Sequence, residues 1–78
     1  MTYEELMSVL RDKNNQRYPN FTLQDLDGNK IDYKDLHVLD AVAMLDWPVE
    51  KILVEESGLL TITLNGGNFK SWHMRNVY

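Results

Sequence analysis

Carboxylates are the chemically active side chains that gather most densely in this sequence. Residues 25–56 hold nine of the 12 acidic residues against three lysines. Around Asp27 and Gly28 they suggest a calcium loop, which needs oxygen ligands at alternate positions and a glycine at the sixth. The spacing fails, because Gly28 as that glycine makes Leu23 the first ligand, and Asp25 as first ligand puts Lys30 at the glycine position. We therefore predict an acidic turn with solvated carboxylates.

The other side chains that could do chemistry are few and scattered. The two histidines, His37 and His73, lie far apart and form no HExxH motif, so they do not predict a zinc site. There is no cysteine, which removes disulfides, Cys-based zinc sites and thiol nucleophiles. No serine stands in a Gly-x-Ser-x-Gly motif. We predict that the protein is not an enzyme and uses neither cofactor nor metal.

The acidic middle of the chain is the first predicted contact surface. Carboxylates on a helix and a neighbouring hairpin could bind a basic protein surface that normally receives phosphates. The alternative is that these carboxylates only form a solvated face, as most clusters of excess charge on soluble domains do. On the first interpretation the protein is a small acidic binding or inhibitor protein, of the kind phages and mobile elements direct against host proteins. The predicted contact residues are Asp25, Asp27, Asp32, Asp35, Asp40 and Asp46.

The end of the chain is the second predicted surface, because it interleaves aromatic and basic side chains. Such a pattern can stack nucleobases and hold phosphates, so a single-stranded nucleic-acid-binding module is the alternative function. Two cations against a net charge of −4 make nucleic acid the weaker hypothesis. The tail could also anchor a protein partner, or pair as an edge strand with a second copy of the chain. Its predicted contact residues are Phe69, Lys70, Trp72, Arg75 and Tyr78.

Length and composition predict one folded domain spanning residues 1–78. With 44% hydrophobic and 26% charged residues, the chain has the composition of a globular protein. It contains no apolar run of about 18 residues and no basic, apolar leader, so we expect a cytoplasmic protein that does not enter membranes. A chain this short buries only about 60% of its unfolded surface, and a partner would help to stabilise it.

The first half of the chain predicts a helix, a hairpin and a second helix. Thr2 and Glu5 form a capping box, followed by an apolar stripe at helical spacing up to about residue 13. Alternating residues 21–26 and a strand over 30–33 flank the Asp27-Gly28 turn. A second helix, capped by Asp35 and more buried than the first, runs to the stop at residues 47–48.

The second half predicts strands over residues 51–55 and 59–64 around a glycine turn, with 69–78 as a possible fifth strand. The expected fold is α+β, in the order α-β-β-α-β-β, with helices packed on one side of an antiparallel sheet. The predicted core is Leu6, Leu10, Phe21, Leu23, Ile31, Leu39, Val42, Leu45, Ile52, Val54, Leu60, Ile62 and Leu64, with Trp47 and Trp72 partly buried.

Overall fold

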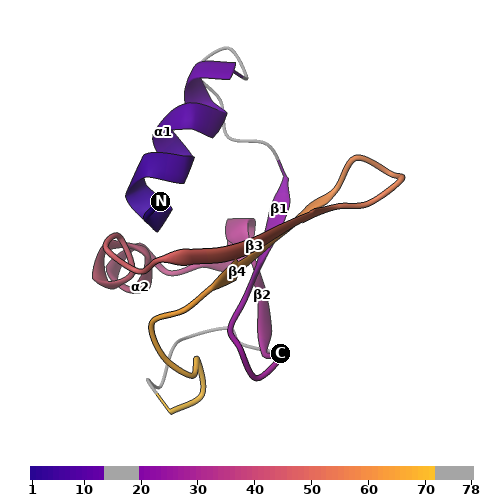
Figure 1. Ribbon diagram of the computed structural model, residues 1–78. Helices are drawn as coiled ribbons and strands as arrows, with labels where there is room; N and C mark the ends of the chain where they lie inside the picture. The colour runs from indigo at the N-terminus through magenta and orange to yellow at the C-terminus, as the bar shows by residue number, and fades with distance from the viewer. Residues whose placement is uncertain (14–19, 72–78) are drawn as a thin grey trace.

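The computed structural model describes residues 1–13 and 20–71, which form an α+β fold with the predicted order of helices and strands (Figure 1). A 3-10 turn, η1, separates the first hairpin from the second helix. The elements are α1 (Tyr3–Lys13), β1 (Phe21–Gln24), β2 (Lys30–Asp32), η1 (Tyr33–Asp35), α2 (Val38–Ala43), β3 (Val49–Val54) and β4 (Leu60–Leu64).

The sheet is mixed, which corrects the prediction of a purely antiparallel sheet. Its strand order is β2-β1-β4-β3. Two antiparallel hairpins, β1–β2 and β3–β4, are joined side by side through a parallel pairing of β1 with β4. In that ladder Leu23 lies opposite Ile62, and both side chains are fully buried. The parallel pairing therefore runs through the centre of the core.

Helix α1 begins and faces the core as predicted. The Thr2 N–H donates to Glu5 Oε1 (3.0 Å), and the Glu5 N–H donates to Thr2 Oγ1 (3.3 Å). This capping box satisfies N–H groups that the first turn of a helix leaves unpaired. Tyr3, Leu6 and Met7 are buried on one face of the helix. Burial of that face is what stabilises a helix of this length.

Both predicted hairpin turns depend on a glycine. Gly28 (φ 87°) and Gly58 (φ 85°) have the left-handed backbone conformation that side chains with a Cβ disfavour. In the second turn the Glu55 N–H donates to the Leu59 carbonyl (2.9 Å), and the Gly58 N–H donates to the Glu55 carbonyl (2.9 Å). The glycines therefore set where each strand reverses and which residues face each other across the hairpin.

Helix α2 differs from its prediction in start, cap and burial. It begins at Val38 rather than after Asp35, because residues 33–35 form η1. His37 is the N-cap, and its Nδ1 accepts a hydrogen bond from the Leu39 N–H (3.1 Å). No residue of α2 is buried, so the expectation that it lies deeper than α1 is wrong. A helix of mainly apolar residues thus lies at the surface.

The core lies between α1, the sheet and the aromatic residues that follow α2 and β4. Trp47 stacks against Phe69, with ring centroids 6.2 Å apart and an interplanar angle of 20°. Gly66 lies so close to the indole that a Cβ there would fall 2.0 Å from a Trp47 ring carbon. The buried core residues are Tyr3, Leu6, Met7, Phe21, Leu23, Ile31, Met44, Trp47, Ile62, Leu64 and Phe69.

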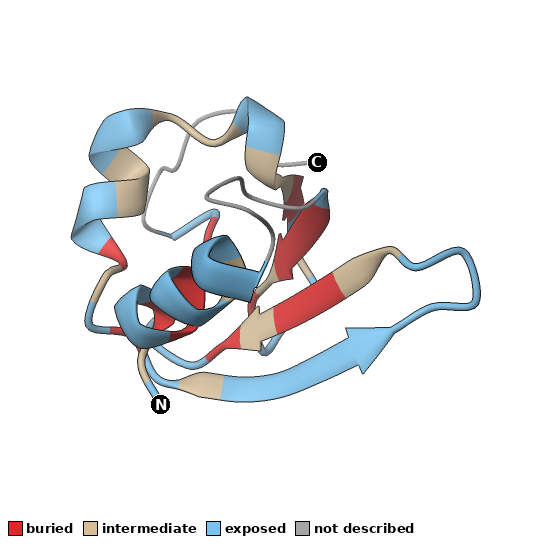
Figure 2. Ribbon diagram, turned by 90° about the horizontal axis from the view of Figure 1, so that it is seen from above, coloured by how far each residue is buried: buried red, intermediate tan, exposed pale blue. Residues whose placement is uncertain are grey.

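The predicted core is only partly confirmed. Leu10, Leu45 and Leu60 are half-buried and pack against the core. Four predicted core residues are instead exposed, namely Leu39, Val42, Ile52 and Val54. The prediction failed because it counted apolar periodicity, whereas these residues lie on α2 and on the edge strand β3, which Figure 2 shows as mainly exposed ribbon. Trp72 and most of the possible fifth strand lie outside the described residues, and residues 69–71 form a turn.

Candidate functional site

Asp25 is the least accessible of the predicted acidic contact residues. Its side chain is 1% exposed, at the turn between β1 and β2. Oδ1 accepts hydrogen bonds from the N–H groups of Asp27 (3.0 Å) and Asn29 (2.8 Å). Oδ2 accepts from Asn29 Nδ2 (2.8 Å) and from the N–H of Phe69 (2.8 Å). The carboxylate therefore organises the turn and ties the chain after β4 to it, and it is not available to a partner.

The protonation of Asp25 follows from this arrangement. Burial raises the pKa of the carboxyl group because it disfavours the charged form. The hydrogen bonds from Phe69, Asn29 and Asp27 favour the charged form and prevail, so the pKa lies below its ordinary value of 3.8. At neutral pH Asp25 is a buried anion held by N–H donors, which is a structural role rather than a catalytic one.

The other predicted acidic residues are spread over several elements. Asp27, in the β1–β2 turn, accepts a hydrogen bond from Asn68 Nδ2 (2.7 Å), and half-buried Asp32, at the end of β2, accepts one from Thr22 Oγ1 (3.2 Å). Asp35, Asp40 and Asp46 fall between η1 and the turn after α2. The six residues therefore form two groups along the chain: Asp25, Asp27 and Asp32 belong to the first hairpin, and Asp35, Asp40 and Asp46 belong to the segment from η1 to the turn after α2.

This segment also carries the exposed aliphatic side chains of α2. Val38, Leu39 and Val42 are between 59% and 69% exposed. Positions four residues apart, such as Val38 and Val42, share a helix face, and Leu39 stands beside them. We call this combination the α2 surface. It consists of Asp35, Val38, Leu39, Asp40, Val42 and Asp46. Its aliphatic residues offer an apolar area for contact, and its aspartates lie beside them in the sequence.

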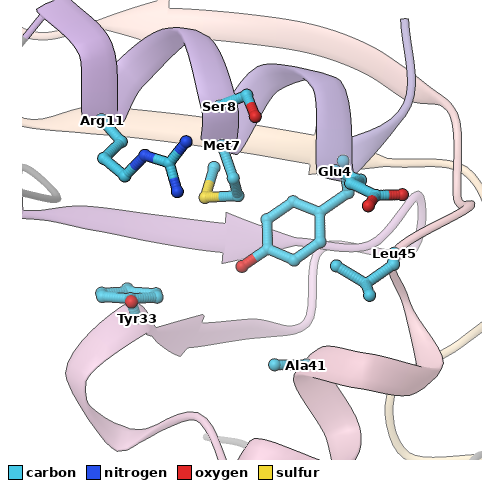
Figure 3. Close-up of a pocket in the computed structure, with 8 residues that line it drawn as sticks. Glu4, Met7, Ser8, Arg11, Tyr33, Ala41 and Leu45 are labelled. Carbon is cyan, nitrogen blue, oxygen red and sulfur yellow. The ribbon is translucent and has the colours of Figure 1, made fainter. Parts of the chain in front are cut away.

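A hollow between α1 and the segment η1–α2 was not predicted. It has a volume of about 290 Å³ and is lined by Tyr3, Glu4, Met7, Ser8, Arg11, Tyr33, Ala41 and Leu45. In Figure 3, Met7 and Arg11 project from α1, and Tyr33 and Ala41 lie across the hollow from them. The spacing of Met7 and Arg11 could have shown that they share a helix face. Their neighbours across the hollow depend on tertiary packing, which periodicity does not reveal.

The hollow and His37 are separate features of the described part of the chain. The hollow contains none of the predicted site residues, and its polar lining consists of the Glu4 carboxylate, the Ser8 hydroxyl, the Arg11 guanidinium and the phenol groups of Tyr3 and Tyr33. His37 has its Nδ1 engaged in the cap of α2, and His73 lies outside the described residues. Within residues 1–13 and 20–71, no three His, Asp or Glu side chains are grouped to hold a metal ion.

The predicted tail surface is only partly described. Phe69 is fully buried against Trp47, while Lys70 is exposed. Trp72, Arg75 and Tyr78 lie outside the described residues. A base cannot stack on a ring that the core already covers, so the nucleic-acid hypothesis loses the first of its aromatic residues.

Comparison with known proteins gives no information about the function of this chain. No protein-family model, curated protein or solved structure matches this chain. Among the described residues, neither helix is long and apolar enough to cross a membrane. What the site can do must therefore be inferred from its own residues.

Proposed function

We propose that this chain is a non-enzymatic protein-binding module that uses the α2 surface to contact a partner protein. The observation that carries this proposal is the exposure of three aliphatic side chains on a helix whose neighbouring residues are acidic. Exposed aliphatic side chains on a small domain mark contact sites when they cluster. The partner that fits is a protein with an apolar patch rimmed by lysine or arginine.

The charge of the whole chain supports this choice of partner. A net charge of −4 repels nucleic acid and attracts a basic protein surface. The carboxylates would speed the encounter and select the partner, while Val38, Leu39 and Val42 would supply buried area in the complex. If the basic surface normally receives an anionic ligand, occupying it would make this protein an inhibitor.

The test is affinity capture from cells of the source organism, followed by affinity measurements with matched variants. Reversal of one acidic side chain in Asp46→Lys should weaken binding roughly tenfold at low salt and less at high salt. Removal of apolar area in Leu39→Ala should weaken it by a similar factor at both salt concentrations.

Each variant has a control elsewhere on the surface. Glu56→Lys makes the same charge change in the exposed β3–β4 turn, and Leu26→Ala truncates a leucine that is also exposed, in the β1–β2 turn. Both controls should bind like the unmodified protein. A captured partner that binds all four variants equally would disprove a contact through the α2 surface.

A further inference from the structure

Strand β3 leaves a second apolar surface exposed, at the edge of the sheet. Among the described strands β3 pairs with β4 alone, because the strand order ends at β3. Ile52, Leu53 and Val54 are 45–63% exposed, and Figure 2 shows this strand on the outside of the sheet. Proteins usually protect such edges with charges, prolines or bulges, because an open edge can pair with another strand.

The start of β3 has this protection, and its second half does not. Val49 N–H donates to the carbonyl of Met1 (2.8 Å), so the N-terminal residues cover the beginning of the edge. Val49 lies opposite Leu64 and Lys51 opposite Thr63, which leaves Glu50 as the extra residue of a bulge. Beyond the bulge, the segment Lys51–Val54 follows β4 in regular register and has no strand on its outer side among the described residues.

The direction of the free backbone groups can be deduced from the bonds that β3 does make. In an antiparallel pair the N–H and C=O of one residue point to the same side, and successive residues alternate. The Glu55 N–H points toward β4, since it donates to Leu59. Leu53 and Lys51 therefore also face β4, and the backbone groups of Ile52 and Val54 point outward.

We propose that β3 pairs antiparallel with β3 of a second copy of this chain, in a register centred on Leu53. In this register Ile52 of each copy lies opposite Val54 of the other copy, so this pair occurs twice. The outward N–H and C=O groups of both residues then form hydrogen bonds between the two copies. Leu53 meets its own counterpart in the non-hydrogen-bonded position, where side chains approach most closely. Lys51 lies opposite Glu55 of the other copy, also twice. The edge is thus self-complementary in backbone bonding, apolar contact and charge.

Other registers can also place the outward-pointing backbone groups of the two copies opposite each other, but they lack this complementarity of side chains. A register centred on Ile52 places Lys51 opposite Leu53, and one centred on Val54 places Leu53 opposite Glu55. Each sets a charged side chain against a leucine and forfeits the opposite-charge pairs. The Leu53 register is therefore the one that the sequence of the edge supports, and it produces a symmetric dimer with one continuous eight-stranded sheet.

Sedimentation equilibrium over a range of concentrations tests the dimer and its register. The mass should rise from 9.2 kDa to twice that value with concentration. Lys51→Glu and Glu55→Lys should each raise the dissociation constant about tenfold, because like charges then face each other twice. The double variant Lys51→Glu/Glu55→Lys restores opposite charges and should return the constant to within about threefold of the original. A double variant no tighter than the singles would overturn the register.

Backbone measurements test the pairing itself. Val54→Pro removes an N–H that no strand among the described residues uses, so the circular dichroism of the variant should stay unchanged while the dimer is lost. Amide hydrogen exchange should slow at Ile52 and Val54 as concentration rises, whereas Leu53, bonded to β4, should be protected throughout. A chain that stays at 9.2 kDa up to millimolar concentration, or a dimer that tolerates Val54→Pro, would overturn the proposal.

Discussion

At the scale of single residues, Asp25 should be the acidic side chain on which stability depends most. In the unmodified protein, Oδ2 of Asp25 accepts hydrogen bonds from Asn29 Nδ2 and the Phe69 N–H. In Asp25→Asn an amide N–H₂ would take the place of Oδ2, so these two donors would lose their acceptor. Leaving buried donors without an acceptor costs roughly 1–3 kcal/mol. We expect the free energy of unfolding, measured in urea at pH 7, to fall by about that amount. The control Asp46→Asn, at an exposed turn position, should change it by less than about 0.5 kcal/mol.

The pH dependence of stability provides a second readout for Asp25. Since its pKa is lowered by folding, the stabilisation from this group is complete well above the ordinary value of 3.8. It is lost as the pH falls through 3.8 toward the lower pKa of the folded state. Stability of Asp25→Asn should therefore decline less steeply than that of the unmodified protein between about pH 5 and pH 2. Parallel profiles would contradict the structural role assigned to this carboxylate.

At the scale of elements, the capping box should stabilise the start of α1 measurably. Thr2→Ala removes the hydroxyl that accepts from the Glu5 N–H and also donates to Glu5 Oε1 (3.1 Å). We expect a loss of about 1 kcal/mol in the free energy of unfolding, as for other N-cap threonines. Ser8→Ala, at an exposed position within the same helix, should be neutral or slightly stabilising. Equal effects of the two substitutions would show that the cap contributes nothing.

The same cap also explains why the start and the buried face of α1 could be predicted from the sequence, whereas the start and the exposure of α2 could not. Local signals, a capping box and an apolar stripe, determine the start and the buried face of α1. Helix α2 has only six residues, and its cap is a histidine, a residue outside the usual N-cap preference. Its apolar side chains gave a helical period, but periodicity cannot reveal whether another element covers the face. The acidic residues beside it were named as contact residues, a prediction that is still to be tested, whereas Leu39 and Val42 were wrongly assigned to the core.

At the scale of the whole molecule, the local hairpins were predictable and their arrangement was not. The turns at Gly28 and Gly58 are encoded by adjacent residues. The parallel ladder between β1 and β4 joins segments almost 40 positions apart, and no short pattern in either strand specifies it. The contact of Asp25 with the Phe69 N–H, 44 positions away, was missed for the same reason. Asp25, which the sequence pattern assigned to the solvated surface, is a buried residue that connects two distant segments of the chain.

The central position of β4 also bears on how the chain folds while it is being synthesised. Of the described strands, β4 comes last in the sequence but lies between β1 and β3, so the sheet has no continuous core until residues 60–64 have left the ribosome. A chain truncated after Leu59 should lack dispersed amide signals in its NMR spectrum, although it retains α1, α2, β1, β2 and β3. Native-like dispersion in that fragment would contradict this. Until β4 arrives, β1 exposes an unpaired inner edge, which makes the unfinished chain a candidate for protection by chaperones.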